Sequence, residues 1–328
     1  MELRTVFNID PSDKKITYDD PVMFIGSCFS TSIGRQFETG HLPVLINPSG
    51  TVYNPVSVSN TLDTIYKRKV YKKNDLHNND GLWLSFNHYT DFSSGDPVKV
   101  IEKINNGSKE ALKFLETARF LFITFGTARV YRWKQSGKIV SNCHKIPSAE
   151  FTHELLSVND VVTLWNDQLE RLQLLHPELK IIFTISPVRH WKDGAHGNQV
   201  SKSVLFLAVE ELLKHPSSPH YFPAYELVMD DLRDYRFYDN DMLHPSSSAV
   251  EYIWNAFTKC YFDNSIMEIW KEVTKITKAV SHQIQRDSGE GVRKFAEKIL
   301  ARIDSITKRI PTLNLNNEKK YFLDLLNS

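Results

Sequence analysis

The chain has 328 residues, of which 41% are hydrophobic and 24% are charged, as in an ordinary globular protein with a full core. Its 40 basic and 39 acidic residues give a formal net charge of +1, which argues against a nucleic-acid-binding protein or one that binds an anionic membrane. The three cysteines are too few for a disulfide framework, residues 1–11 contain no signal-like apolar run, and no apolar stretch reaches membrane length. We therefore predict a cytoplasmic protein with no membrane contact.

Short apolar runs alternate with helical patterns along the first 262 residues. The runs are apolar on both faces, which is typical of the central strands of a parallel sheet. They cover residues 22–25, 43–46, 120–125, 181–185 and 221–228. Helical periodicity predicts helices over residues 109–118, 159–175, 201–214 and 246–262, with Asn159 and Ser246 as N-caps of the second and fourth. This alternation predicts a three-layer α/β/α sandwich with right-handed crossovers.

Two insertions and a C-terminal extension depart from this rhythm. Residues 83–92 alternate weakly within a polar connection, and residues 129–140 predict a β-hairpin. After Asp263 the strand pattern stops, and residues 266–285, 291–310 and 318–326 predict amphipathic helices that pack on the core or on a second subunit. The predicted division is an α/β domain over residues 1–262 and a helical extension over residues 263–328, through which the chain would form a homo-oligomer.

Ligands of open parallel sheets bind beyond the carboxyl ends of the strands, so the loops at those ends are the candidate site. The first loop contains Gly26, Ser27 and Cys28, and a helix is expected to begin there. A serine or cysteine at such a turn is exposed above the sheet, close to helix N–H groups that stabilise a thiolate or an oxyanion. Ser27 and Cys28 are therefore candidate nucleophiles; the alternative is a buried small residue with a helix cap.

The loop after the last predicted strand contains Asp241 and His244, three residues apart on one turn. A carboxylate at this spacing can bond the imidazole, fix its tautomer and stabilise the imidazolium, as in a catalytic triad. The alternative is an exposed acidic turn with a histidine at the start of a helix.

The remaining loops offer further polar groups. Gly50 has a backbone N–H suited to an oxyanion hole, or else belongs to a simple Pro/Gly turn. Asn142 and His144 follow the hairpin and are candidate hydrogen-bond donors, or else its polar end. Arg189 is suited to bind a carboxylate or phosphate of the substrate, and His190 either joins it or caps a strand end.

Together these motifs resemble the GSCFA family, named for the sequence that appears here as Gly26-Ser27-Cys28-Phe29-Ser30. The resemblance spans residues 20–260. It continues in residues 124–128, 142–145, 186–190, 221–226 and 241–246.

The GSCFA family is grouped with the SGNH/GDSL hydrolases, so the resemblance implies a flavodoxin-like sandwich that hydrolyses or transfers ester-linked acyl groups. It implies a triad with Asp241 and His244. It also implies oxyanion-hole roles for Gly50 and for Gly126, which opens the third conserved block. In register with the Gly-Asp-Ser-Leu block of those enzymes, Cys28 occupies the nucleophile position, and a slip of one residue would make it Ser27.

The chain departs from the SGNH pattern at Ala128, where an asparagine of the third block is expected. Candidates for the missing donor are Asn54, Asn142 and His144. The leading hypothesis is a hydrolase or acyltransferase acting on a small-molecule or carbohydrate ester, with no cofactor. The main alternative is a non-catalytic module that binds a small ligand. A metal site is disfavoured because the twelve histidines show no close ligand spacing.

Overall fold

The computed structural model of the chain describes residues 5–281 and 290–327. Its centre is a five-stranded sheet in which all neighbouring strands are parallel, in the order β10-β9-β5-β1-β2. The strands are β1 (Val22–Gly26), β2 (Val44–Ile46), β5 (Phe120–Phe125), β9 (Lys180–Ile185) and β10 (His220–Tyr221). Numbered by their order in the chain, the five strands lie as 2-1-3-4-5, which is the flavodoxin-like arrangement. The predicted fold class is therefore confirmed.

Helices cover both faces of this sheet, because its strands alternate buried side chains between two hydrophobic clusters. Val22 and Phe24 of β1 pack toward α1 (Cys28–Thr39) and α7 (Ser247–Tyr261). Met23 and Ile25 pack toward the opposite helical layer. That layer consists of α2 (Pro55–Tyr66), α3 (Pro97–Thr117), α4 (Val158–Leu175) and α5 (Gly194–Leu212).

The fifth predicted strand is mostly wrong. Only His220 and Tyr221 pair with β9, and the chain then forms α6 (Ala224–Glu226) and a π-helical segment, η5 (Leu227–Asp231). The change begins at Pro223, which has no N–H for a strand ladder and whose carbonyl instead accepts the amide of Leu227 at 3.1 Å.

Helix caps explain where two predicted helices begin. Ser157 caps α4, because its Oγ accepts the amide of Asp160 at 3.1 Å while the Asp160 carboxylate accepts the amide of Ser157 at 2.8 Å. Asn159 was the wrong prediction for this cap and lies inside the first turn. Ser246 is confirmed as the N-cap of α7.

The two insertions form a layer of their own beside the sheet. The first contains β3 (His77–Asn79) and β4 (Leu82–Leu84); the second is the predicted hairpin, β6 (Arg129–Trp133) and β7 (Ile139–Val140), to which β8 (Phe151–Leu155) adds a third strand. A small cluster containing Leu84, Trp133 and Phe151 joins the two insertions. Short turns complete the elements: η1 (Lys73–Asp75), η2 (Thr90–Phe92), η3 (Ser148–Glu150), η4 (Trp191–Asp193) and η6 (Tyr235–Phe237).

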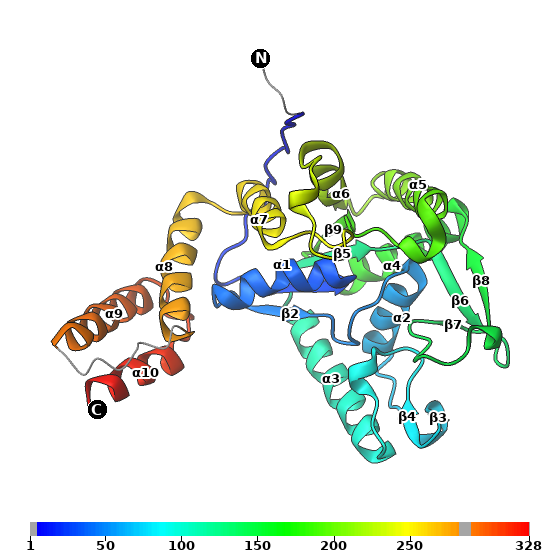
Figure 1. Cartoon of the computed structure of the whole chain (residues 1–328), viewed down its shortest axis with the longest axis horizontal. Coiled ribbons are helices and arrows are strands. Elements are labelled where there is room, and N and C mark those ends of the chain that lie inside the picture. The colour runs from blue at the N-terminus through cyan, green and yellow to red at the C-terminus, as the bar shows by residue number, and fades with distance from the viewer. Residues whose placement is uncertain (1–4, 282–289, 328) are drawn as a thin grey trace.

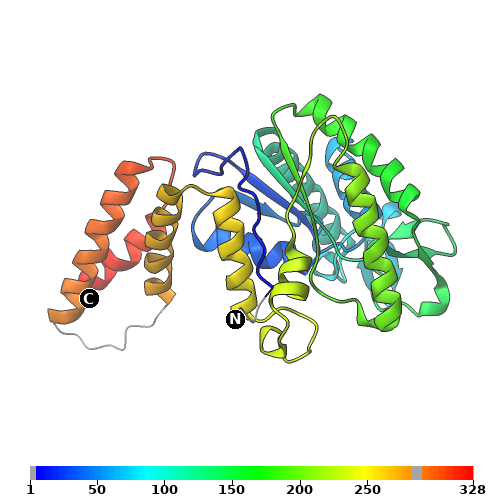
Figure 2. The same ribbon diagram turned by 90° about the horizontal axis from the view of Figure 1, so that it is seen from above.

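The C-terminal extension is α8 (Asn264–Ser281), α9 (Glu290–Arg309) and α10 (Asn316–Leu326). These helices lie at one end of the molecule and strands β6 and β8 at the other (Figures 1 and 2). The prediction of a helix through residue 285 extends beyond the described residues. The α8 helix packs on α1, and the Trp270 indole donates to the Gln36 carbonyl at 3.0 Å. Within the described ranges, no helix has both the length and the apolar character needed to cross a membrane.

Candidate active site

The turn between β1 and α1 is built on a glycine that no other residue can replace without movement. Gly26 has φ +146°, and a Cβ at this position would lie 2.2 Å from the Thr124 carbonyl oxygen of β5. This close approach brings the end of β1 against β5. The next residue, Ser27, is 1% exposed and caps α1, with its Oγ accepting the amide of Phe29 at 3.3 Å. Cys28 is the first residue of α1 and is only half-buried.

The Cys28 thiol lies among groups that act on its pKa in opposite directions. Burial raises the pKa, while the backbone N–H groups of Phe29 and Cys28 and the ammonium of Lys202 lower it. The Asp241 carboxylate raises it. The Asp241 carboxylate thus has an electrostatic effect on Cys28, although the two residues lie more than two hundred positions apart in the chain.

The Asp241 turn holds a preformed carboxylate–imidazole pair. His244 Nδ1 lies 2.5 Å from Asp241 Oδ2, and Asp241 Oδ1 accepts the amides of Leu243 and His244 at 2.9 Å each. The backbone N–H of His244, followed by its side chain, lowers the pKa of Asp241 to about 2. Met242 completes the turn with φ +60°. His244 Nε2 has no hydrogen-bond partner among the described residues, and the His244 side chain is 48% exposed.

Lys202 of α5 is a buried cation beside this site that the sequence analysis did not identify. It is 0% exposed, and its Nζ donates to the carbonyls of Gly126 and Ser186 at 2.7 and 2.6 Å. Gly126 and Ser186 directly follow β5 and β9. The available signal was a lysine on the apolar face of a predicted amphipathic helix, three and seven residues before the buried Leu205 and Val209.

Tyr53, Arg189 and His190 also border the site. The Tyr53 carbonyl accepts the amide of Gly126 at 2.7 Å, and the Tyr53 ring lies 6.2 Å from the His190 ring. Burial and then the neighbouring Cys28 raise the pKa of Tyr53, so its hydroxyl stays protonated. Burial lowers the pKa of His190. Tyr53 was not identified as a site residue from the sequence, because nothing in its local pattern separates it from a packing aromatic.

Arg189 has a guanidinium without an ion-pair or hydrogen-bond partner among the described residues. Its Nε is buried, and its Cζ lies 5.5 Å from the centre of the Trp191 ring. The charge of Arg189 also lowers the pKa values of Lys202, Tyr225 and Tyr238.

The two glycines expected at an oxyanion hole have amides that are already bonded. Gly50 donates to the Asn47 carbonyl at 2.7 Å, and Gly126 donates to Tyr53. Ala128, at the place of the missing asparagine, is fully buried, and its amide donates to Ser201 Oγ at 2.8 Å. Asn54 caps α2 through Oδ1, which accepts the amide of Ser57 at 2.9 Å. Its Nδ2 has no hydrogen-bond partner among the described residues.

Asn142 and His144 make hydrogen bonds within the layer formed by the two insertions. Asn142 Oδ1 accepts the amide of His144 at 2.8 Å. The two ring nitrogens of His144 lie 2.9 Å from the Ser85 carbonyl and 3.4 Å from Ser93 Oγ. The structure thus places His144 as a tie between loops, with both of its nitrogens engaged, instead of bringing it to Cys28.

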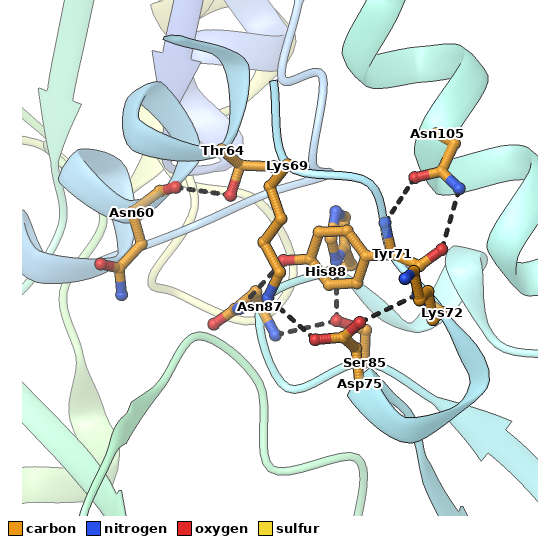
Figure 3. A network of polar contacts seen from close by, with 10 residues as sticks. All are labelled: Asn60, Thr64, Lys69, Tyr71, Lys72, Asp75, Ser85, Asn87, His88 and Asn105. Carbon is orange, nitrogen blue, oxygen red and sulfur yellow. Dashed lines mark hydrogen bonds and ion pairs between the residues drawn. The ribbon is translucent and has the colours of Figure 1, made fainter. Parts of the chain in front are cut away.

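A cavity of about 670 Å³ lies outside this cluster, between α2 and the β6–β7 hairpin. Figure 3 shows the polar network at its wall, in which Lys69 pairs with Asp75 at 3.2 Å and the Asn87 side-chain amide donates to the Tyr71 hydroxyl at 3.0 Å. Burial lowers the pKa of His88 to about 3, and its Nδ1 lies 2.8 Å from Ser85 Oγ. Because these groups bond one another, the network ties the first insertion together. In the described part of the chain, no group of three or more His, Cys, Asp or Glu side chains is arranged to hold a metal ion.

Comparison with known proteins identifies the family. A search of curated proteins found no match. Two solved structures are similar at 11% identity, too distant to support an argument about function. One, "a putative platelet activating factor" from Streptococcus pneumonia, has a TM-score of 0.34 and covers 73% of this chain and 83% of its own. The other, "a putative GDSL-like lipase" from Parabacteroides merdae, has a TM-score of 0.38 and covers 77% and 98%.

The sequence profile of the GSCFA family matches residues 21–257, and that of the C-terminal domain of GSCFA domain proteins matches residues 273–328. The first match covers most of the chain and includes every candidate site residue discussed above. The chain therefore belongs to the GSCFA family.

Proposed function

We propose that the chain is an acyl-ester hydrolase or acyltransferase that uses Cys28 as its nucleophile, His244 as general base and Asp241 as the group that orients His244. The observation that carries the proposal is the 2.5 Å bond between His244 Nδ1 and Asp241 Oδ2, in a turn whose carboxylate acts on the Cys28 thiol. This bond fixes the imidazole so that Nε2 is left to accept a proton.

The reaction that these groups support has two halves. In the first, Cys28 Sγ attacks the ester carbonyl carbon while His244 takes the thiol proton, and the alcohol then leaves with that proton, which yields a thioester on Cys28. In the second, water or an acceptor alcohol gives its proton to His244 and attacks the thioester, which returns the free thiol. The acyl acceptor decides between hydrolysis and transfer.

Cys28 is favoured over Ser27 by their local roles. The Ser27 hydroxyl is buried and occupied as the cap of α1, whereas Cys28 is half-buried and the N–H groups of the first helical turn lower the pKa of its thiol. A substrate carbonyl bound at the same N–H groups would have its developing negative charge stabilised there. The Tyr53 hydroxyl, whose pKa Cys28 raises, and the unbonded Nδ2 of the adjacent Asn54 are the donors that would replace the missing third-block asparagine.

The unpaired guanidinium of Arg189 supports a substrate that carries a negative group, such as a carboxylate or phosphate, because an arginine fork without a protein partner binds such anions well. A small-molecule or carbohydrate ester with an anionic substituent fits this border of the site.

The test is turnover of p-nitrophenyl acetate and the mass of the trapped acyl-enzyme, compared between wild type, C28A and H244A. We expect acetylation of Cys28 and a loss of about 10²- to 10⁴-fold in turnover for either variant. C143A removes another half-buried thiol and is the matched control, which should keep full activity. S27A should retain acylation at Cys28.

The competing function is a non-catalytic module for a small ligand, and the bonded amides of Gly50 and Gly126 favour it. If C28A turns over esters as fast as wild type and no acyl group is found on Cys28, the binding function stands and the enzymatic proposal is abandoned.

A further inference from the structure

Lys202 is a lysine where an apolar residue is expected. It lies on the inner face of α5 with Leu205, Val209 and Leu212, and all four side chains are buried. Burying an ammonium costs free energy unless the charge is compensated, so a fully buried lysine calls for a compensating group.

The protein groups around Lys202 accept hydrogen bonds from its ammonium group but carry no negative charge to pair with it. Two N–H donors of Nζ are used by the Gly126 and Ser186 carbonyls, and the Tyr225 ring lies 5.5 Å from Nζ. No carboxylate forms an ion pair with Lys202 in the described ranges. Two carbonyl dipoles and an aromatic face stabilise a cation without neutralising it.

The anion that the site can provide is the Cys28 thiolate. Gly126 packs against the first turn of α1, since a Cβ built on Gly126 would lie 3.5 Å from Ser27 Cβ. The carbonyl that holds Lys202 is therefore next to the turn that presents Cys28. The charged or titratable groups that act on Lys202 or are acted on by it are Cys28, Arg189, Tyr225 and His190. Lys202 and Asp241 act on Cys28, and Cys28 in turn raises the pKa of Tyr53.

We propose that Lys202 is a positioning residue whose buried ammonium is the counter-charge of the Cys28 thiolate, which it stabilises from beneath while it holds the ends of β5 and β9 together. This inference rests on the proposed function only in taking Cys28 as the reactive group. The negative charge of Asp241 raises the pKa of the same thiol and so disfavours the thiolate, whereas the positive charge of Lys202 lowers that pKa.

The effects of the two groups on each other have the signs of such a pair, while burial shifts the pKa of each toward its neutral form. Burial lowers the pKa of Lys202 to about 7, and the Cys28 thiolate raises it. Burial raises the pKa of the Cys28 thiol, and Lys202 lowers it. Each group therefore favours the charged form of the other, which is the signature of two coupled titrations.

The alternative is that Lys202 only ties two strand ends together, and thiol alkylation separates the two roles. The rate of reaction with iodoacetamide is followed at each cysteine by peptide mass spectrometry as a function of pH, in wild type and K202M. We expect alkylation of Cys28 below pH 7, where Lys202 carries its charge, to fall about tenfold or more in K202M, the change that one pKa unit produces, with the midpoint of its pH profile moved upward.

Cys143 is the internal reference in the same experiment. Burial raises the pKa of its thiol to about 11, and the cation that lowers it is Lys192. K192M should therefore slow alkylation of Cys143 and leave Cys28 unchanged, while K202M does the reverse. A folded K202M, with the circular dichroism and thermal midpoint of wild type, whose Cys28 profile is unchanged would overturn the proposal.

A reciprocal measurement covers the case in which K202M does not fold. Coupling between two sites is mutual, so C28A must lower the pKa of Lys202, read from the side-chain ¹³Cε resonance of labelled lysine and assigned with K202R. An unchanged lysine titration in C28A would contradict the proposal. Neither measurement uses an ester, so the two proposals can fail separately. If the titrations of Cys28 and Lys202 are coupled but no ester is turned over, the proposed function is rejected and this inference stands. If esters are turned over but the titrations are uncoupled, this inference is rejected and the proposed function stands.

Discussion

At the scale of single residues, the site is a thiol surrounded by groups that each stabilise one of its charge states. Lys202 and the first N–H groups of α1 favour the thiolate, and burial and Asp241 favour the thiol. Under the proposed function, a thiol held in this balance would be protected from indiscriminate oxidation or alkylation at rest and would need a base such as His244 to react.

The Tyr53 hydroxyl gives the first prediction at this scale. Its pKa is raised by burial and by Cys28, so it is a neutral donor throughout the working pH range. If it replaces the missing asparagine of the oxyanion hole, Y53F should lower kcat about 10²- to 10³-fold with little change in KM, because the bond strengthens only as charge develops on the substrate oxygen.

The matched control for Y53F is Y66F. Tyr66 is another tyrosine whose pKa is raised by burial, and its hydroxyl has no hydrogen-bond partner. Steady-state kinetics of Y66F should equal those of wild type. Equal kinetics of Y53F and wild type would remove Tyr53 from the site.

The candidate site residues that the sequence alone indicates are those with a local signature. Cys28 follows a strand and starts a helix, and Asp241 and His244 are close enough in the chain to pair by themselves. The sequence alone does not indicate Lys202 and Tyr53 as candidates, since their proposed roles depend on β5 and β9 being neighbours in the sheet. His144 was a candidate by its nearness to a strand end, yet its ring nitrogens are engaged by Ser85 and Ser93.

At the scale of elements, the position of Cys28 depends on how closely β1 approaches β5. Gly26 makes this approach possible, because its backbone lies where any side chain would meet the Thr124 carbonyl. The end of β1 is held further by Asn47, whose Oδ1 accepts the Gly26 amide at 2.8 Å. The turn that presents the thiol is therefore shaped by three parallel strands acting together.

G26A tests this dependence. The added Cβ meets a backbone atom at 2.2 Å and requires a φ that L-residues rarely adopt, so we expect a loss of about 3 kcal/mol or more in the free energy of unfolding. Urea denaturation followed by circular dichroism measures it. G107A, in the middle of α3 with its nearest contact at 3.8 Å, should instead be neutral or stabilise the protein by up to about 1 kcal/mol. Similar effects of the two variants would contradict the argument.

The elements that could be predicted were those whose own hydrophobic pattern is sufficient to identify them. Strands β1, β5 and β9 are buried on both faces and their sequences are continuous apolar runs. β8 was missed because Phe151 is its only fully buried residue, so its sequence reads as a polar connection. The last strand was predicted to be too long because most of residues 221–228 are apolar. Beyond Pro223 these apolar side chains are buried in a helical segment and not in a strand.

At the scale of the whole molecule, the C-terminal helices share a hydrophobic core with the layer of α1 and α7. One hydrophobic cluster runs from Val22 and Phe37 through Trp254 to Val273, Ile303 and Phe322. The apolar side of α8 thus packs on α1, the helix that begins at Cys28, as well as on α9 and α10. The division of the chain after residue 262 and the association of its helices with a second copy stay predictions.

A shared core predicts that the extension and the sheet unfold together, and Trp270 is the residue with which to test this. Its ring lies 5.3 Å from that of Trp254 and leaves no room for a side chain at Gly40. Since Trp270 is partly buried, W270A should lower the free energy of unfolding by on the order of 2–3 kcal/mol while the protein still unfolds in a single transition.

Urea unfolding is read by circular dichroism and by exposure of the buried Cys260 of α7 to alkylation. We expect the two signals to coincide in both proteins, and L174A, which truncates an 82% exposed side chain, to behave as wild type. Loss of helix signal in W270A while Cys260 stays protected would mean that the extension is a separate unit.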